Sequence, residues 1–214
     1  MTLLKYILHP QIIQCSKPKI INLIVPYLIY FFIIILYIPF ISIMARLVNI
    51  EHISPKGYDF TIILMGVFLA PIYEEICCRL WLVASKRNYL IVIACLSSIS
   101  FVELFRGKYL ISIIFITISI LLVSINFIDK QKIKTLYLRY FRFLFWFSAL
   151  LFGLLHATNF RGCTFTIIAL SPLLCLPQII MGFILGYIRM SYGFWYGVLL
   201  HFLINSTLLF NLVK

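Results

Sequence analysis

Charged residues are scarce in this chain. Only 11% of its 214 residues are Asp, Glu, Lys or Arg, whereas a typical soluble domain carries about 25%. Hydrophobic residues make up 64% of the chain, and its mean hydropathy is +1.10. Apolar stretches long enough to cross a bilayer, about 20 residues each, therefore fill most of the chain and leave little room for a separate water-soluble domain.

Cysteine pairs of the Cys-x-x-Cys type are absent. The chain has six cysteines, most of them within apolar runs: Cys15, Cys77, Cys78, Cys95, Cys163 and Cys175. Zinc sites and redox motifs rely on pairs at that spacing. We therefore interpret these cysteines as small buried hydrophobic residues.

Acidic residues are few as well: six, against 18 Lys and Arg, for a net charge of +12. A nucleic-acid binder would gather such cations on a solvated face within a recognisable module. Here they lie in short loops between apolar runs, where basic side chains set orientation and contact anionic lipid headgroups. The pattern indicates membrane lipid as a partner and no nucleic acid.

The apolar segments predict an all-α, polytopic transmembrane helix bundle of about seven spans. The first segment contains Pro26 and Pro39, which bend a helix, and we interpret it as one span. The approximate segments are 20–45, 60–84, 88–105, 109–128, 141–160, 172–190 and 193–212.

One connecting segment is longer than the others and strongly basic. We expect a loop from Asp129 to Arg142, which carries Lys130, Lys132, Lys134, Arg139 and Arg142. The positive-inside rule places such a loop in the cytoplasm, and in a seven-span protein the N-terminus is then cytoplasmic too.

Three ionisable residues interrupt the second apolar segment, GVFLAPIYEEICCRLWL. A charge at a helix centre costs about 2.5–3.5 kcal/mol on insertion scales, so such residues persist mainly where they are paired or functional. Glu75 and Arg79 are four residues apart and can pair on one helix face. Glu74 is turned about 100° away from Glu75. One carboxylate is therefore structural, and Glu74 is free for chemistry, unless the whole set snorkels to water at the end of the span.

Two later segments carry polar residues in similar surroundings. His156 lies near the end of one span, and His201 and Asn205 share a face of the last span. Each alone is more often a hydrogen-bonded structural residue. Together with the acidic pair they are the groups needed to polarise water and stabilise an oxyanion.

These motifs resemble the CPBP family, the CAAX prenyl protease and bacteriocin-processing intramembrane proteases, also called Abi. Its pattern is Glu-Glu-x-x-x-Arg, Phe-x-x-x-His and His-x-x-x-Asn/Asp on three helices in that order. The matching residues here are Glu74, Glu75 and Arg79, then Phe152 and His156, then His201 and Asn205. The resemblance covers about residues 60–210. It implies an intramembrane protease core in 60–214, preceded by an N-terminal segment, 1–59, with the first helix.

The resemblance also implies a mechanism for cutting a peptide or membrane-anchored protein. Glu74, helped by His156, would activate water as general base, and His201 and Asn205 would stabilise the oxyanion. Glu75 and Arg79 would support the acidic helix. Glu74, His156 and His201 could also supply three ligands to a divalent metal such as zinc, although the helical His-Glu-x-x-His zinc signature is absent.

Two other classes stay open from the residues alone. An ion-coupled transporter also uses buried acidic and basic residues, but it predicts inverted repeats, and the sequence shows no clear halves. A non-catalytic membrane immunity or assembly protein would keep the fold and lose the chemistry. The small size favours the bacterial members of the family, which are associated with peptide or bacteriocin maturation and self-immunity at the cell membrane.

Overall fold

The computed structural model describes residues 2–53, 64–107, 109–125, 130–162 and 164–207. Nearly all of these are helical, and a single two-stranded antiparallel pairing is the only sheet among them. The longer helices are α1 (Leu3–Leu8), α2 (Ile21–Leu47), α4 (Ala70–Arg79), α5 (Lys86–Phe105), α6 (Tyr109–Ile125), α7 (Lys130–Leu155), α8 (Thr164–Leu174), α9 (Leu176–Tyr192) and α10 (Phe194–Asn205). Shorter helical turns are η1 (Met65–Leu69), η2 (Leu80–Leu82) and η3 (His156–Asn159), and the strands are β1 (Glu51–His52) and β2 (Phe160–Arg161).

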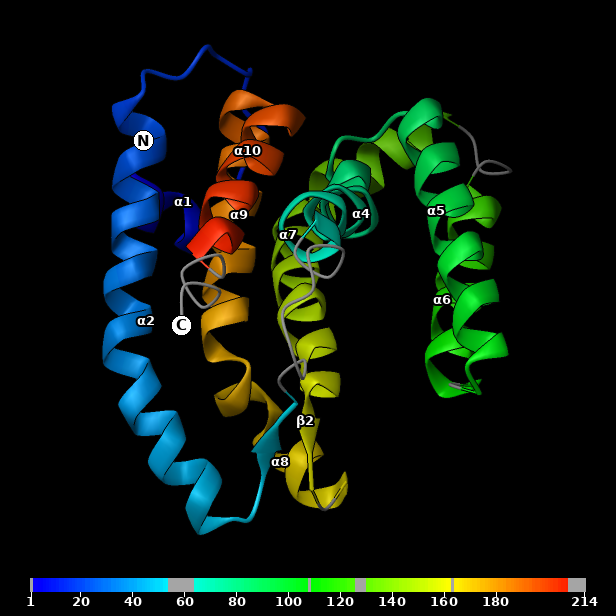
Figure 1. Ribbon diagram of the computed structural model, residues 1–214. Coiled ribbons are helices and arrows are strands. Elements are labelled where there is room, and N and C mark those ends of the chain that lie inside the picture. The colour runs from blue at the N-terminus through cyan, green and yellow to red at the C-terminus, as the bar shows by residue number, and fades with distance from the viewer. Residues whose placement is uncertain (1, 54–63, 108, 126–129, 163, 208–214) are drawn as a thin grey trace.

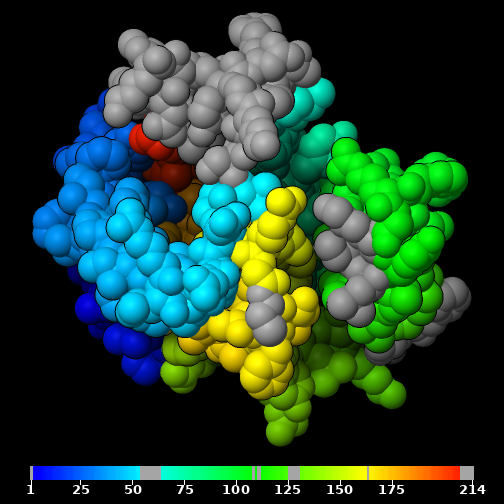
Figure 2. All heavy atoms as spheres, turned by 60° about the horizontal axis from the view of Figure 1, so that its bottom comes forward, coloured from blue at the N-terminus to red at the C-terminus, as the bar shows by residue number. Residues whose placement is uncertain are grey.

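The helices stand in three groups beside one another (Figure 1). On one side α2, α9 and α10 pack together, α4 and α7 lie in the middle, and α5 with α6 forms a hairpin on the other side. The hairpin contacts the rest of the described chain chiefly through α4 and η2. In the tilted view of Figure 2, α2 (blue to cyan) and the hairpin (green) lie at opposite edges of the molecule.

The middle group is tightly joined to its neighbour by the pair α7 and α9. A Cβ added to Gly153 of α7 would lie 2.7 Å from the backbone nitrogen of Ile179, and one added to Gly182 of α9 would lie 2.7 Å from the carbonyl oxygen of Ala149. The two backbones therefore touch. Small residues allow the two backbones to approach closely. In a membrane, where burying apolar surface gives no net gain, such close van der Waals packing stabilises helix association.

Helix α2 confirms the single first span. It continues through both Pro26 and Pro39 for 27 residues, which is about 40 Å of helix and enough to cross a bilayer. Most of its large apolar side chains are exposed in the isolated chain. Such a surface is expected to face lipid.

The all-α transmembrane bundle predicted from composition is confirmed, and each of the seven apolar segments contains helix. Among the described residues, three stretches are long and apolar enough to span a membrane: Ile21–Leu47, Lys86–Phe105 and Gln131–Asn159. The bent pair α8 and α9, at 45°, makes a fourth. Ser112–Ser124 and Phe194–Asn205 are shorter apolar helices. The count of about seven is therefore approximate.

The predicted loop from Asp129 to Arg142 is wrong for the residues that the structure describes. Helix α7 already begins at Lys130 and continues to Leu155. The stretch 130–152 contains neither Gly nor Pro, and Lys, Gln, Arg and Leu are good helix formers. The basic residues thus extend a membrane helix instead of ending it. The cytoplasmic orientation stays a prediction, and the predicted boundary at residues 59 and 60 lies outside the described residues.

The cysteine prediction is confirmed in part. Cys78, Cys95 and Cys175 are buried, Cys77 is half-buried, Cys15 is exposed, and Cys163 lies outside the described residues. Cys15 belongs to the extended segment before α2, where its thiol faces the carbonyl oxygen of Met190. A segment of this kind has no apolar helix face to bury its side chains.

Candidate active site

Helix α4 brings the three ionisable residues of the second apolar segment to the centre of the protein. Glu75 and Arg79 are completely buried. The Nη1 group of Arg79 donates a hydrogen bond to Oε1 of Glu75 at 2.6 Å. This is the pairing that their four-residue spacing predicts. In a low-dielectric interior each charge is held by the other, and separating them would leave an uncompensated buried charge.

His201 of α10 joins this pair from the far end of the chain. Its Nδ1 lies 3.0 Å from Oε1 of Glu75, and its Nε2 lies 3.5 Å from Oε2 of Glu74. Glu75 and His201 are 1% exposed at their side chains, whereas Glu74 is 33% exposed. His201 therefore bridges a buried carboxylate and a reachable one.

Gly197 gives the buried carboxylate its space. It lies one helical turn before His201, and a Cβ at this position would lie 3.3 Å from Oε2 of Glu75. The same oxygen has no hydrogen-bond partner among the described residues. A side chain on Gly197 would therefore crowd the carboxylate of Glu75.

Phe152 of α7 is a platform for the charged groups, a role that the motif alone does not reveal. The Arg79 guanidinium lies over its ring, 3.9 Å from the centroid. The rings of His156 and His201 contact Phe152 edge to face, with centroids 4.9 and 5.7 Å away. The cation–π contact compensates in part for the guanidinium nitrogens of Arg79 that lack hydrogen-bond partners among the described residues.

His156 lies in η3, directly after α7, and is oriented by its own helix. Its Nδ1 donates to the carbonyl oxygen of Phe152 at 2.8 Å, because a carbonyl can only accept. In the neutral ring Nε2 then keeps its lone pair. Two contacts with the segment after α2 stabilise this turn. Glu51 pairs with Arg161 between the two strands, and the Ile53 amide donates to the carbonyl oxygen of Asn159.

Asn205 shares α10 with His201 but contacts a different element. Its Nδ2 donates to the carbonyl oxygen of Gly66 at 3.0 Å. Gly66 belongs to η1, a π-helical turn directly before α4. Such turns are rare and occur frequently at functional sites. The sequence contains no recognisable signal for this turn.

The end of α4 is held by side chains from α7 and α9. Ser148 donates to the carbonyl oxygen of Cys78, and Arg189 donates from Nε to that of Arg79 at 3.4 Å. Tyr137 donates to the carbonyl oxygen of Leu82 in η2. The last carbonyls of a helix have no partner within it. These three side chains therefore fix the position of the helix that carries Glu74.

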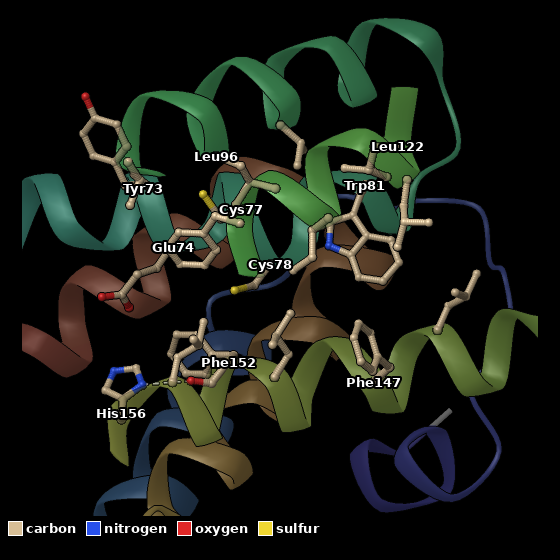
Figure 3. A pocket seen from close by; sticks show the side chains of 18 of the residues that line it. Tyr73, Glu74, Cys77, Cys78, Trp81, Leu96, Leu122, Phe147, Phe152 and His156 are labelled. Atoms are coloured by element: carbon tan, nitrogen blue, oxygen red, sulfur yellow. Dashed lines mark hydrogen bonds between the residues drawn. The ribbon is translucent and has the colours of Figure 1, made fainter. Parts of the chain in front are cut away.

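A cavity of about 500 Å³ opens beside Glu74 between α4, α5, α6 and α7. Its walls are mainly aliphatic and aromatic, including Trp81, Leu96, Leu122 and Phe147. Figure 3 shows the Glu74 carboxylate and the His156 ring at the same end of this space. The cavity thus has one polar end, with the remaining length apolar.

The predicted metal ligands are only partly gathered. Glu74 and His201 approach each other, as given above, but no group of three His, Cys, Asp or Glu side chains in the described residues is arranged to hold a metal ion.

The fold and this site together define a class: a helical membrane protein in which a buried Glu-His-Arg cluster contacts Glu74, the carboxylate at the polar end of an apolar cavity. Comparison with protein families matches residues 56–207 to the type II CAAX prenyl endopeptidase Rce1-like family, and the chain belongs to that family. The resemblance drawn from the three motifs is confirmed. No curated protein and no solved structure matches the chain.

Family membership indicates a CAAX-type intramembrane endopeptidase. It implies a peptide or protein substrate in a membrane context. Together with the long apolar helices, it supports a multi-pass membrane protein.

Proposed function

We propose that this protein hydrolyses a peptide bond of a membrane-associated peptide or protein, with Glu74 as the general base. One observation carries the proposal. Among the described residues that line the cavity, Glu74 is the one carboxylate, and it lies at the polar end together with His156. A general base must reach the water that it activates, and the partial exposure of Glu74 allows this.

In the proposed reaction a water molecule lies between Glu74 and the lone pair of His156 Nε2. Glu74 removes a proton as the water oxygen attacks the peptide carbonyl carbon. The same proton is then delivered to the departing amine, so the carboxylate is regenerated.

The negative oxygen of the tetrahedral intermediate needs hydrogen-bond donors in a site shielded from bulk water. His201 can present its Nε2 proton, since Nδ1 is engaged by Glu75. Asn205 donates one proton of its side-chain amide to the carbonyl oxygen of Gly66. Its second amide proton can be donated to the oxyanion, because a side-chain amide nitrogen carries two protons. These two residues are the proposed oxyanion donors.

Charge balance supports the division between the two carboxylates. Glu75 and Arg79 form a buried ion pair without net charge, whereas Glu74 is 33% exposed. A neutral pair limits the cost of burying charge in a low-dielectric interior. Glu75 and Arg79 then act as the fixed, buried half, and Glu74 is the half that exchanges protons.

The cavity favours a substrate with an apolar chain beside the scissile bond. Its volume lies within the range of about 300–1,000 Å³ that is typical of small-molecule pockets. Its walls are mainly apolar, and Thr158 and Asn159 are polar lining residues that follow His156 in the chain. A CAAX-type substrate, which carries an isoprenoid on its cysteine, combines both features. Bacteriocin-like peptides stay a prediction from sequence resemblance.

The test uses purified protein in liposomes with a prenylated peptide as substrate and mass spectrometry as the readout. Glu74→Gln should lower the cleavage rate by about 100-fold or more, because it removes a general base. Glu103→Gln is the matched control, since Glu103 pairs with Arg106 near the end of α5 and should leave cleavage unchanged. Equal product from wild type and Glu74→Gln would overturn the proposal and favour a non-catalytic membrane protein.

A further inference from the structure

Two thiols meet at the junction between α4 and α5. The Sγ atoms of Cys77 and Cys95 lie 3.3 Å apart, and no disulfide joins them. The residues are 18 positions apart in the chain. A disulfide needs the sulfurs at about 2.0 Å, so small side-chain rotations separate this pair from a covalent bond.

The two thiols differ in how they can be reached. Cys77 lines the apolar cavity and is half-buried, and Figure 3 shows its sulfur between the cavity residues Glu74 and Leu96. Cys95 does not line the cavity and is only 8% exposed. A molecule in the cavity can therefore meet Cys77 first, and Cys95 stands directly behind it.

The pair also lies where the hairpin is attached. The α5–α6 hairpin contacts the rest of the described chain chiefly through α4 and η2. It supplies one wall of the cavity, with Val92 and Leu96 from α5 and Phe115 and Leu122 from α6. A covalent bond between Cys77 and Cys95 would fix this wall to the helix that carries Glu74.

We propose that Cys77 and Cys95 form a modification site, a dithiol that an apolar organic hydroperoxide oxidises to a reversible disulfide. The apolar walls of the cavity select a hydroperoxide that partitions into lipid. Cys77 attacks the O–O bond, which gives a sulfenic acid on Cys77 and releases the alcohol, with the thiol proton on the leaving oxygen. Cys95 then attacks the sulfenic sulfur, and water leaves as the disulfide forms. The hydroperoxide is reduced, and the two thiols are oxidised.

Reduction reverses the step. A dithiol attacks the disulfide and is itself oxidised to a cyclic disulfide, which returns both cysteines to thiols. The bond ties α4 to the hairpin, and a cavity whose wall cannot move against α4 should admit a bulky substrate less easily. The consequence for cleavage rests on the proposed function, whereas formation of the bond does not.

The chemical test uses the full-length protein in liposomes treated with cumene hydroperoxide, followed by alkylation and peptide mapping. A cross-linked peptide pair containing Cys77 and Cys95, lighter by two hydrogen atoms, is expected in the wild type and in the control Cys175→Ala. It should be absent from Cys77→Ala and Cys95→Ala. Hydrogen peroxide at equal concentration should form the bond more slowly. Both thiols remaining alkylatable after complete exposure to cumene hydroperoxide would overturn the proposal.

A second readout separates this site from the protease proposal. Cleavage by the wild type should fall several-fold after oxidation and return with dithiothreitol. Cys95→Ala, whose side chain lies outside the cavity, should cleave at the wild-type rate, and the hydroperoxide should not lower that rate. Loss of cleavage in oxidised Cys95→Ala equal to that in the wild type would contradict the regulatory consequence. A disulfide that forms in a protein without any protease activity would leave the modification site standing and overturn only the proposed function.

Discussion

The two sides of the cavity are built differently. On the side of α7, α9 and α10, backbones touch at Gly153 and Gly182, and the charged cluster of Glu75, Arg79 and His201 is buried. On the other side, the α5–α6 hairpin is mostly apolar and is attached chiefly through α4 and η2. The tightly packed side therefore holds the reactive groups in place, and the loosely attached α5–α6 hairpin shapes the space for the substrate.

The largest expected effect concerns the buried pair. Arg79→Ala should destabilise the protein by about 3–5 kcal/mol, because it removes the buried guanidinium that compensates the charge of Glu75 and leaves this carboxylate with the contact to His201 alone. Arg106→Ala is the control, because Arg106 pairs with Glu103 while its own side chain is 64% exposed and that of Glu103 is 13% exposed. Such exposed pairs contribute about 0–1 kcal/mol. Thermal or denaturant unfolding in detergent measures both, and equal losses would contradict the contrast.

A backbone contact should give the next largest effect. Gly182→Ala places a methyl group 2.7 Å from the carbonyl oxygen of Ala149, so α7 and α9 must separate, at a cost of about 1–3 kcal/mol. Gly66→Ala is its control, since a Cβ there meets nothing within 4 Å. If both variants unfold at the same temperature, the close approach of α7 and α9 does not contribute to the stability of the protein.

A change in the cavity wall should alter binding more than chemistry. Leu122 of α6 lines the cavity, and Leu122→Trp fills space that the substrate chain would occupy. KM should rise about 10-fold, equivalent to about 1.4 kcal/mol of uniform binding, with kcat nearly unchanged. Leu121→Ala, on the same wall, removes bulk and should not raise KM in this way. A fall in kcat alone would show that the hairpin takes part in the chemistry.

The smallest effect is expected within the hairpin itself. Ser100 and Ser112 exchange hydrogen bonds between α5 and α6, with their hydroxyls 2.8 Å apart. Ser100→Ala should cost about 0.6 kcal/mol, the average for such contacts between membrane helices. Ser124→Ala is the control, because among the described residues Ser124 donates to a carbonyl of its own helix, that of Leu121. A loss comparable to that of Arg79→Ala would contradict the view of the hairpin as a loosely held wall.

The local parts of the site could be predicted from the sequence, because helix geometry alone brings residues four apart to one face. The Glu75–Arg79 pair follows from that rule. The family resemblance implies that Glu74 and His201 share a site, but it does not predict the contact of His201 with Glu75 across 126 positions. No periodicity specifies which helices become neighbours.

Other features depended on packing that no motif encodes. Phe152 holds Arg79 on its ring because α7 packs against α4 there; the Phe-x-x-x-His motif includes Phe152 but does not reveal this contact. The bond from Asn205 to Gly66 depends on a π-helical turn. The contact between Cys77 and Cys95 cannot be predicted from the sequence, because their spacing of 18 positions matches no cysteine motif. Helix α7 begins at Lys130, where the sequence predicts a loop, because basic residues occur in loops but Lys and Arg are also good helix formers.

Metal dependence stays a prediction that a simple experiment can address. Exhaustive treatment with a chelator, followed by removal of the chelator, should abolish cleavage if Glu74, His156 and His201 hold a required metal, and added zinc should restore it. The side-chain mechanism proposed above predicts full cleavage after the same treatment.

The most direct test of the central claim, that Glu74 activates water, follows the oxygen atom. Wild-type protein in excess over a prenylated peptide is allowed one turnover in heavy-oxygen water, and the new carboxylate is analysed by mass spectrometry. A general base predicts one heavy oxygen in the product carboxylate of that first turnover. An unlabelled product, with the label on the carboxylate of Glu74, would show that Glu74 attacks the substrate itself and would contradict the account.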